Sequence, residues 1–223
     1  MATATATRPF ALTSIGKKYI MGITGLIWAG FVFAHMAGNL LIFVGQEAYN
    51  NYGHGLTSGY SIYLIETILV AALLAHIFCA ISLTIENRAA RGGKRYAVTP
   101  NGEKGSSLAS RTMAFQGSIV LFFIVSHLIT FKFGTFYQVG NTDVRDLYKL
   151  MVEIFKQPGY VAWYVVSLLL LGAHLSHGVS SIFQSFGFPL EKYAGLIKKV
   201  GWIYAGVVIS GFLSQPIYIF INN

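Results

Sequence analysis

The sequence predicts an all-α fold: an integral membrane bundle of five transmembrane helices, with its N-terminus in the cytoplasm and an amphipathic helix on the outer side. Only 11% of the 223 residues are charged and 54% are hydrophobic, whereas a soluble domain carries about a quarter charged residues. Five apolar runs each come close to the ~20 residues that a helix needs to cross a bilayer. Lys and Arg are concentrated between these runs, as membrane orientation requires.

The five runs follow one another within a single domain that covers residues 1–223. We expect helices at about residues 19–44, 61–86, 111–132, 160–186 and 200–221. The first run is too long for the core of a signal peptide, so we expect it to be retained. Flanking residues mark the ends of three runs: Lys17 and Lys18 before the first, Pro189 after the fourth, and Lys198 and Lys199 before the fifth.

Basic residues give the expected orientation. Twelve of the sixteen Lys and Arg residues lie in the N-terminal tail and in the segments after the second and fourth runs. The remaining four are Lys132, Arg145, Lys149 and Lys156. The positive-inside rule therefore places the N-terminus in the cytoplasm and the C-terminus outside. Because the positive charge follows the topology in this way, the net charge of +8 does not indicate nucleic acid as a partner.

The segment between the third and fourth runs, residues 142–157, is predicted to be an amphipathic helix at the outer interface. Its apolar residues recur at helical spacing: Val144, Leu147, Leu150, Met151, Ile154 and Phe155. Pro158 and Gly159 end the pattern. The helix is either a rigid connector or a lid over a pocket on the outer side, and the sequence leaves both open.

Histidines are distributed over the first four runs and are absent from the fifth. They are His35, His76, His127, and the close pair His174 and His177. A sixth, His54, is expected at the surface in the glycine-rich loop 52–60. Ionisable groups inside a membrane are costly and usually functional. Counted from the outer ends of the runs at 1.5 Å per residue, His35 and His127 lie ~8–15 Å deep and His76 and His174 ~20–23 Å deep.

The four histidines therefore form two layers, each with two rings from different helices. Two neutral imidazoles that face one another across a bundle can ligate haem iron on both faces of a porphyrin. Zinc and di-iron sites need three or four protein ligands, often with carboxylates. The lone cysteine, Cys79, excludes covalent haem attachment through Cys-x-x-Cys-His. By depth, His174 rather than His177 is the expected ligand, and His177 is assigned to a haem propionate or a backbone partner.

Three motifs resemble the dihaem cytochrome b subunit of succinate dehydrogenases and fumarate reductases. They are His-Met-Ala-Gly-Asn-Leu at 35–40, Ile-Glu-Asn-Arg at 85–88 and Gly-Ala-His-Leu-Ser-His-Gly at 172–178. The resemblance covers nearly the whole chain. It implies two haems b, the inner one on His76 and His174 and the outer one on His35 and His127. It also implies a multi-pass anchor in the bacterial cytoplasmic membrane that passes electrons from an iron–sulfur subunit, itself bound to a flavoprotein subunit, to quinone, usually menaquinone.

Glu66 is the only acidic residue well inside a run, near the outer layer. Quinone chemistry moves protons together with electrons and needs a titratable group at the site. The resemblance adds that an outer-side acid serves this purpose in some relatives. We therefore expect Glu66 to transfer protons at an outer quinone site, and the alternative is a hydrated carboxylate without such a role.

Other functions remain open from the residues alone. A haem b subunit of a hydrogenase or formate dehydrogenase would use the same histidine pattern, and only the motifs argue against it. A histidine-dependent membrane metalloenzyme would cluster its histidines near one face, whereas only His174 and His177 are close in sequence. A transporter usually has broken helices or inverted repeats, and neither is evident. A haem-free anchor leaves the buried histidines without a role.

Overall fold

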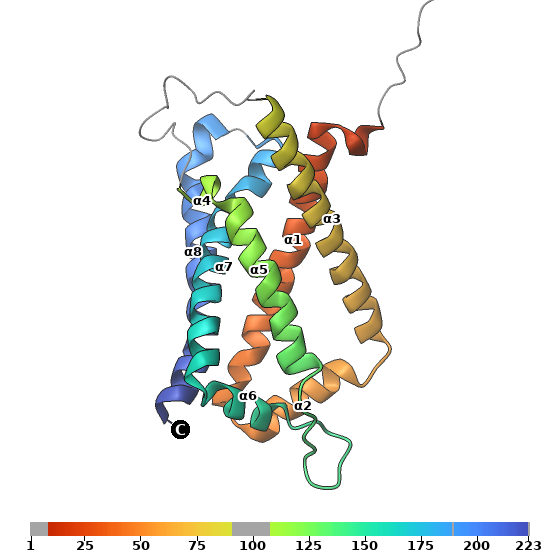
Figure 1. The fold of residues 1–223 in the computed structure, drawn as a ribbon, viewed down its shortest axis with the longest axis vertical. Helices are drawn as coiled ribbons and strands as arrows, with labels where there is room; N and C mark the ends of the chain where they lie inside the picture. The colour runs from red at the N-terminus through yellow and green to blue at the C-terminus, as the bar shows by residue number, and fades with distance from the viewer. Residues whose placement is uncertain (1–8, 91–107, 189, 223) are drawn as a thin grey trace, which may run out of the picture.

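Helices make up nearly all of the chain that the computed structural model describes, namely residues 9–90, 108–188 and 190–222. The helices are α1 (Ser14–Asn39), α2 (Gln46–Thr57), α3 (Ser61–Ala90), α4 (Leu108–Arg111), α5 (Met113–His127), α6 (Leu147–Phe155), α7 (Pro158–Ser185) and α8 (Leu190–Asn222). A 3-10 turn, Leu40–Phe43, continues α1, and a π-helical turn, Leu128–Lys132, continues α5. The first described residues and the C-terminus lie at opposite ends (Figure 1), which are called the N-terminal end and the C-terminal end below.

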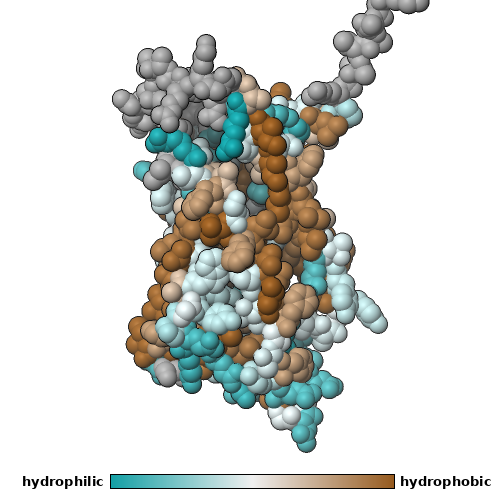
Figure 2. Space-filling view, in the orientation of Figure 1, coloured by the Kyte–Doolittle hydropathy of each residue, from teal (hydrophilic) through white to brown (hydrophobic). Residues whose placement is uncertain are grey.

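Five helical segments are long and apolar enough to cross a membrane, which confirms the predicted all-α membrane bundle. They are Ser14–Phe43, Ser61–Ala90, Met113–Lys132, Pro158–Ser185 and Lys192–Asn222. Figure 2 shows apolar residues across the middle of the visible face and hydrophilic residues toward both ends. This distribution suits a bundle whose middle lies in hydrocarbon and whose ends lie in the interfaces.

Four of these segments form a ring. Helix α1 packs against α3 and α7, and α5 packs against the same two helices. Helices α1 and α5 are therefore diagonally opposite, and so are α3 and α7. Helix α8 lies outside the ring, mainly against α7 and to a lesser extent against α1. The interior of the ring is thus lined by the four helices that carry the histidines of the two layers.

Local signals explain where several helices begin. The Thr13 side chain accepts a hydrogen bond from the backbone N–H of Gly16 at 3.1 Å and caps α1. Asp146 caps α6 in the same way by accepting from Lys149 N at 3.0 Å. Pro158 begins α7 at a position where its missing N–H costs no hydrogen bond.

The predicted boundaries are wrong at three places. Helix α1 begins at Ser14 instead of 19, so Lys17 and Lys18, expected before it, lie inside it. Residues 46–57, expected as a loop, form α2, which includes His54 in a half-buried position. Helix α8 begins at Leu190 instead of 200, so Lys198 and Lys199 lie inside it. An apolar run ends at the first charges, whereas a helix continues into the interface because its exposed charged side chains are hydrated there. Pro189, expected to end the fourth helix, lies outside the described residues.

The predicted amphipathic segment is shorter than expected: α6 covers only Leu147–Phe155. Its apolar side chains Leu150, Met151 and Phe155 are buried. The helix packs against α2, α7 and α8 at the C-terminal end. In this position α6 is a connector that is built into the core.

Candidate functional site

Two pairs of histidine rings meet inside the four-helix ring. His35 of α1 faces His127 of α5, with ring centroids 5.9 Å apart and ring planes at 84°. His76 of α3 faces His174 of α7, with centroids 6.5 Å apart and planes at 61°. Each pair joins diagonally opposite helices and so spans the bundle interior. In each of the two layers, the structure thus brings together the two rings that were expected at the same depth from the sequence.

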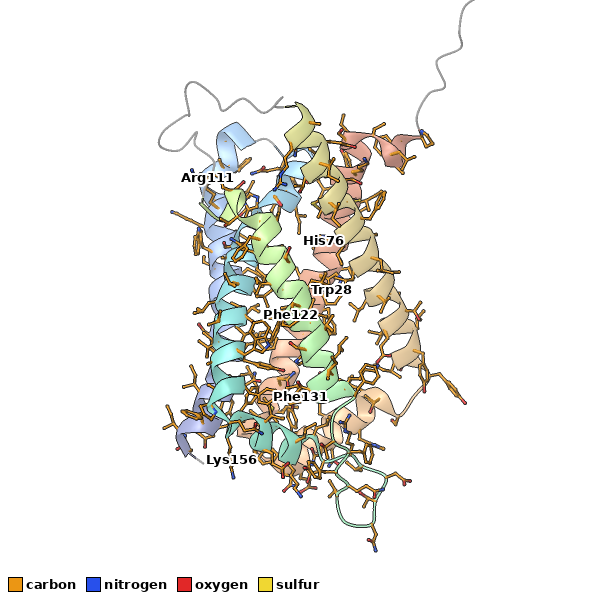
Figure 3. The ribbon with its side chains drawn as sticks, viewed as in Figure 1. Trp28, His76, Arg111, Phe122, Phe131 and Lys156 are labelled. Carbon is orange, nitrogen blue, oxygen red and sulfur yellow. The ribbon has the colours of Figure 1, made fainter. Side chains whose placement is uncertain are left out.

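The two pairs lie at different heights in the bundle. A Cβ atom added to Gly25 of α1 would lie 3.7 Å from the His76 ring, so Gly25 marks the height of that pair. His35 follows Gly25 by ten residues, which is about 15 Å along a helix. Figure 3 places His76 toward the N-terminal end, and Phe131, whose ring contacts His127, toward the C-terminal end.

Tyr164 of α7 determines the surroundings of His127. Its hydroxyl oxygen lies 3.1 Å from Nδ1 of the histidine. Tyr164 is only 5% exposed, and its ring packs nearly at right angles to Phe123 and Phe155, each at a centroid distance of 4.9 Å. Because Phe155 belongs to α6, the connector helix holds the tyrosine beside the histidine pair.

Thr24 of α1 has the corresponding place beside His76. Its Oγ1 atom lies 3.1 Å from Nδ1 of His76. The hydroxyl donates to the carbonyl oxygen of Ile20 at 2.8 Å, with the Met21 carbonyl at 3.2 Å. Since this bond uses the hydroxyl proton, a lone pair of Oγ1 faces the imidazole.

The other ring of each pair has different polar neighbours. Asn39 Nδ2 lies 3.4 Å from both ring nitrogens of His35 and donates to the His35 carbonyl at 2.8 Å. The Asn39 amide is oriented by Tyr49, whose hydroxyl donates to Oδ1 at 2.7 Å. Burial raises the pKa of Tyr49, so this donor keeps its proton. His174 Nδ1 is buried without a hydrogen-bond partner among the described residues.

The donor sets suit an iron held between two imidazoles. Two metal–nitrogen bonds of about 2.0–2.1 Å, the value for zinc, and two ring radii separate the centroids by about 6 Å. The observed separations of 5.9 and 6.5 Å lie on either side of this value. Over the described residues, no group of three or more His, Cys, Asp or Glu side chains could hold a metal ion.

Glycines leave room beside the pair nearer the N-terminal end. Gly25 and Gly117 come from α1 and α5, the two ring helices that do not supply this pair. Added Cβ atoms would lie 3.7 Å from His76 and 3.6 Å from His174. These rings therefore lie next to backbone that carries no side chain, a lining that fits a flat macrocycle such as haem. His177, three residues after His174 on α7, is half-buried near it.

Glu66 lies on α3 beside an open groove of about 460 Å³. The groove is lined by Tyr63, Glu66, Thr67, Val70, Ala71 and Leu74. The Glu66 carboxylate forms an ion pair with Lys132 at the end of the π-helical turn after His127. All lining residues belong to α3, so α6 does not close over this groove.

The N-terminal end has a second ion pair between ring helices. Lys17 of α1 is buried and pairs with Glu86 of α3, and the Ser14 hydroxyl donates to the same carboxylate at 3.0 Å. Glu86 belongs to the Ile-Glu-Asn-Arg motif, so this motif has a structural role in joining α3 to α1. Several basic residues used for the orientation lie outside the described residues: Arg8, Arg91, Lys94, Arg95 and Lys104.

Sequence reasoning missed Thr24, Tyr164 and Lys132. A signal for Tyr164 was present, because it lies four residues inside its run, close to the depth of His127 in the neighbouring run. Thr24 and Lys132 carried no such signal, since their partners are 52 and 66 residues away along the chain. No family model, curated protein or solved structure matches this chain.

Proposed function

We propose that this protein is a dihaem cytochrome b that anchors a succinate dehydrogenase or fumarate reductase in the membrane and carries electrons to or from quinone. The observation that supports the proposal is the presence of two histidine ring pairs, each across a diagonal of the four-helix ring. Bis-imidazole ligation of this kind gives a six-coordinate iron suited to electron transfer.

In this proposal each histidine pair has one task. His35 and His127 hold the outer haem, and His76 and His174 hold the inner haem. The bound haems supply reversible one-electron chemistry, and the ring helices keep water away from both pairs. The layers are about 15 Å apart along the helices, so electrons cross the bundle through two successive sites. His177 remains the proposed contact for a haem propionate.

Glu66 and Lys132 are the proposed proton-handling groups for a quinone in the groove on α3. They lie at the C-terminal end, in the half of the bundle that contains His35 and His127. A carboxylate can exchange a proton with a bound quinol, and the ion pair with Lys132 would hold the Glu66 side chain beside the groove. Menaquinone is the proposed substrate, on the resemblance described above.

The distribution of basic residues supports a position for the two soluble subunits. The flavoprotein and iron–sulfur subunits would bind the N-terminal end, on the cytoplasmic side of a bacterial inner membrane, where the positive-inside rule puts most basic residues. The inner pair, His76 and His174, is the nearer one to that end. Electrons would therefore enter or leave the soluble subunits through the inner haem.

The test is a reduced-minus-oxidised spectrum with haem quantification on the purified protein. We expect two non-covalent, low-spin haems b per chain. One haem per chain, or a high-spin spectrum, would contradict the pairing. Co-purification of flavin- and iron–sulfur-containing subunits identifies the complex, whereas a nickel- or molybdenum-containing partner would indicate a hydrogenase or formate dehydrogenase instead.

A further inference from the structure

The two histidine pairs share a polar arrangement that their ligand role alone does not require. In each pair one ring has a hydroxyl oxygen 3.1 Å from its Nδ1 atom: Tyr164 for His127 and Thr24 for His76. Both hydroxyls come from the ring helix that packs beside the histidine's own helix. Neither residue carries a formal charge.

Ligation through Nε2 determines the direction of both hydrogen bonds. An imidazole that gives its Nε2 lone pair to a metal carries its proton on Nδ1, which must then find an acceptor. For His76 the side-chain acceptor is Thr24 Oγ1, whose own proton is donated to Ile20, and the Met21 backbone is a further hydrogen-bond partner of the ring. For His127 it is the Tyr164 oxygen, held by the buried aromatic cluster around it.

The opposite rings lack an equivalent acceptor. The group that faces His35 is the Asn39 Nδ2 atom, a donor, because Tyr49 occupies the Asn39 oxygen. For His174, Nδ1 has no hydrogen-bond partner within the described part of the chain. Each pair therefore combines one ring whose Nδ1 faces an oxygen and one ring whose Nδ1 does not.

We propose that Tyr164 and Thr24 are positioning residues, one for each haem, which fix the ring orientation of His127 and His76 and increase their electron donation to iron. This inference rests on the proposed dihaem function. An acceptor on Nδ1–H raises the basicity of the ligand. A more basic ligand stabilises the oxidised iron, and this lowers the midpoint potential of that haem.

Two matched variants test the assignment. Tyr164→Phe removes the acceptor of His127, and Thr24→Val removes that of His76, with little change in shape. Each should raise the midpoint potential of one haem and leave the other unchanged, as measured by redox titration of the purified holoprotein. Low-temperature electron paramagnetic resonance should show altered g-values for the same haem only. Thr24→Ser keeps the oxygen and should restore the wild-type potential of the inner haem.

The outcomes separate this inference from the function on which it rests. A wild-type protein without two haems would contradict both. Two haems whose potentials stay unchanged in Tyr164→Phe and Thr24→Val would overturn the positioning role alone, as would an equal shift of both haems in either variant. If Tyr164→Phe does not assemble, fluorotyrosine at position 164 keeps the hydroxyl but weakens it as an acceptor, and should raise the potential of the outer haem alone.

Discussion

Glu66 and Lys132 form a pair that crosses between two ring helices at the edge of the bundle. Their side chains are 37% and 41% exposed, and an ion pair this accessible contributes about 0–1 kcal/mol to stability. We therefore expect assembly not to depend on this pair. Replacing either partner should affect the chemistry at the groove and leave the fold unchanged.

Glu66→Gln should assemble with both haems and retain dicarboxylate activity with artificial dyes, yet lose activity with quinone. The substitution keeps size and hydrogen bonding but removes the titrating proton. Lys132→Met should weaken quinone turnover without changing haem content. If the two act as a unit, the double variant is no slower than Glu66→Gln, because effects within one network are not additive. Full quinone turnover in Glu66→Gln would place the proton path elsewhere.

Single side chains differ in how far the sequence predicts their surroundings. Depth along an apolar run was enough to group His35 with His127 and His76 with His174, since a straight helix converts residue number into height. The partner of Glu66 could not be predicted, because Lys132 lies 66 residues away along the chain and the π-helical turn that carries it has no sequence signature. Nothing in the sequence distinguishes Thr24 from other hydroxyl residues in apolar runs, because it reaches His76 only through the packing of α1 on α3.

Helices α2 and α6 are joined by a buried polar network at the C-terminal end. Asp146, which caps α6, accepts hydrogen bonds from Gln46 Nε2 at 2.7 Å and Asn50 Nδ2 at 2.8 Å. Asn50 is 2% exposed, and its oxygen accepts from Tyr148 N at 2.9 Å. The network ties two segments that are about one hundred residues apart in sequence and holds α6 against α2.

Asn50→Ala should loosen this junction. It leaves the Tyr148 backbone N–H without its partner, at a cost of about 1–3 kcal/mol, and removes one of the hydrogen bonds that Asp146 accepts. We expect a lower unfolding temperature and faster tryptic cleavage at Lys149 and Lys156. Asn51→Ala is the matched control, because Asn51 is exposed beside it. Equal cleavage of the two variants would show that the network does not hold α6.

The existence of the long helices was predictable, while their ends and the short helices were not. The length of an apolar run reflects the thickness of the hydrocarbon layer and not the full length of the helix, so residues 190–199 of α8 were assigned to a loop. The glycines at 53, 55 and 59 argued for a loop where α2 forms. Its helical state depends on burial of Asn50 against α6, which is a tertiary effect that local propensity does not contain.

At the scale of the whole bundle, the ring of four helices predicts which two histidines are needed to bind the same haem. His76→Ala or His174→Ala should remove the inner haem alone, and His35→Ala or His127→Ala the outer haem alone, because each haem would lose one of its two axial ligands. Haem content and difference spectra of the purified variants measure this. His177→Ala and His54→Ala should keep both haems. Loss of a haem in His177→Ala, but not in His174→Ala, would shift the ligand assignment by one turn of α7.

The topology of the whole molecule can be tested directly. Five spans put the two termini on opposite sides, and the basic residues predict that the C-terminus lies outside. Alkaline phosphatase fused after Asn223 should be active in intact cells, and a green fluorescent protein fused there should be dark. The reverse pattern would invert the bundle and move the proposed docking face of the soluble subunits to the other side of the membrane.

Because each histidine pair joins diagonally opposite helices, the two pairs become able to form one after the other during biosynthesis. A chain enters the membrane from its N-terminus, so α1 and α5 are both present before α7 leaves the ribosome. His35 and His127 can therefore meet before the fourth span has been inserted, whereas His76 can meet His174 only after that span is present. Tyr164 arrives with that same span. The last helix, α8, adds no histidine to either pair; it packs mainly against α7, and its Phe212 ring lies 5.9 Å from that of His35.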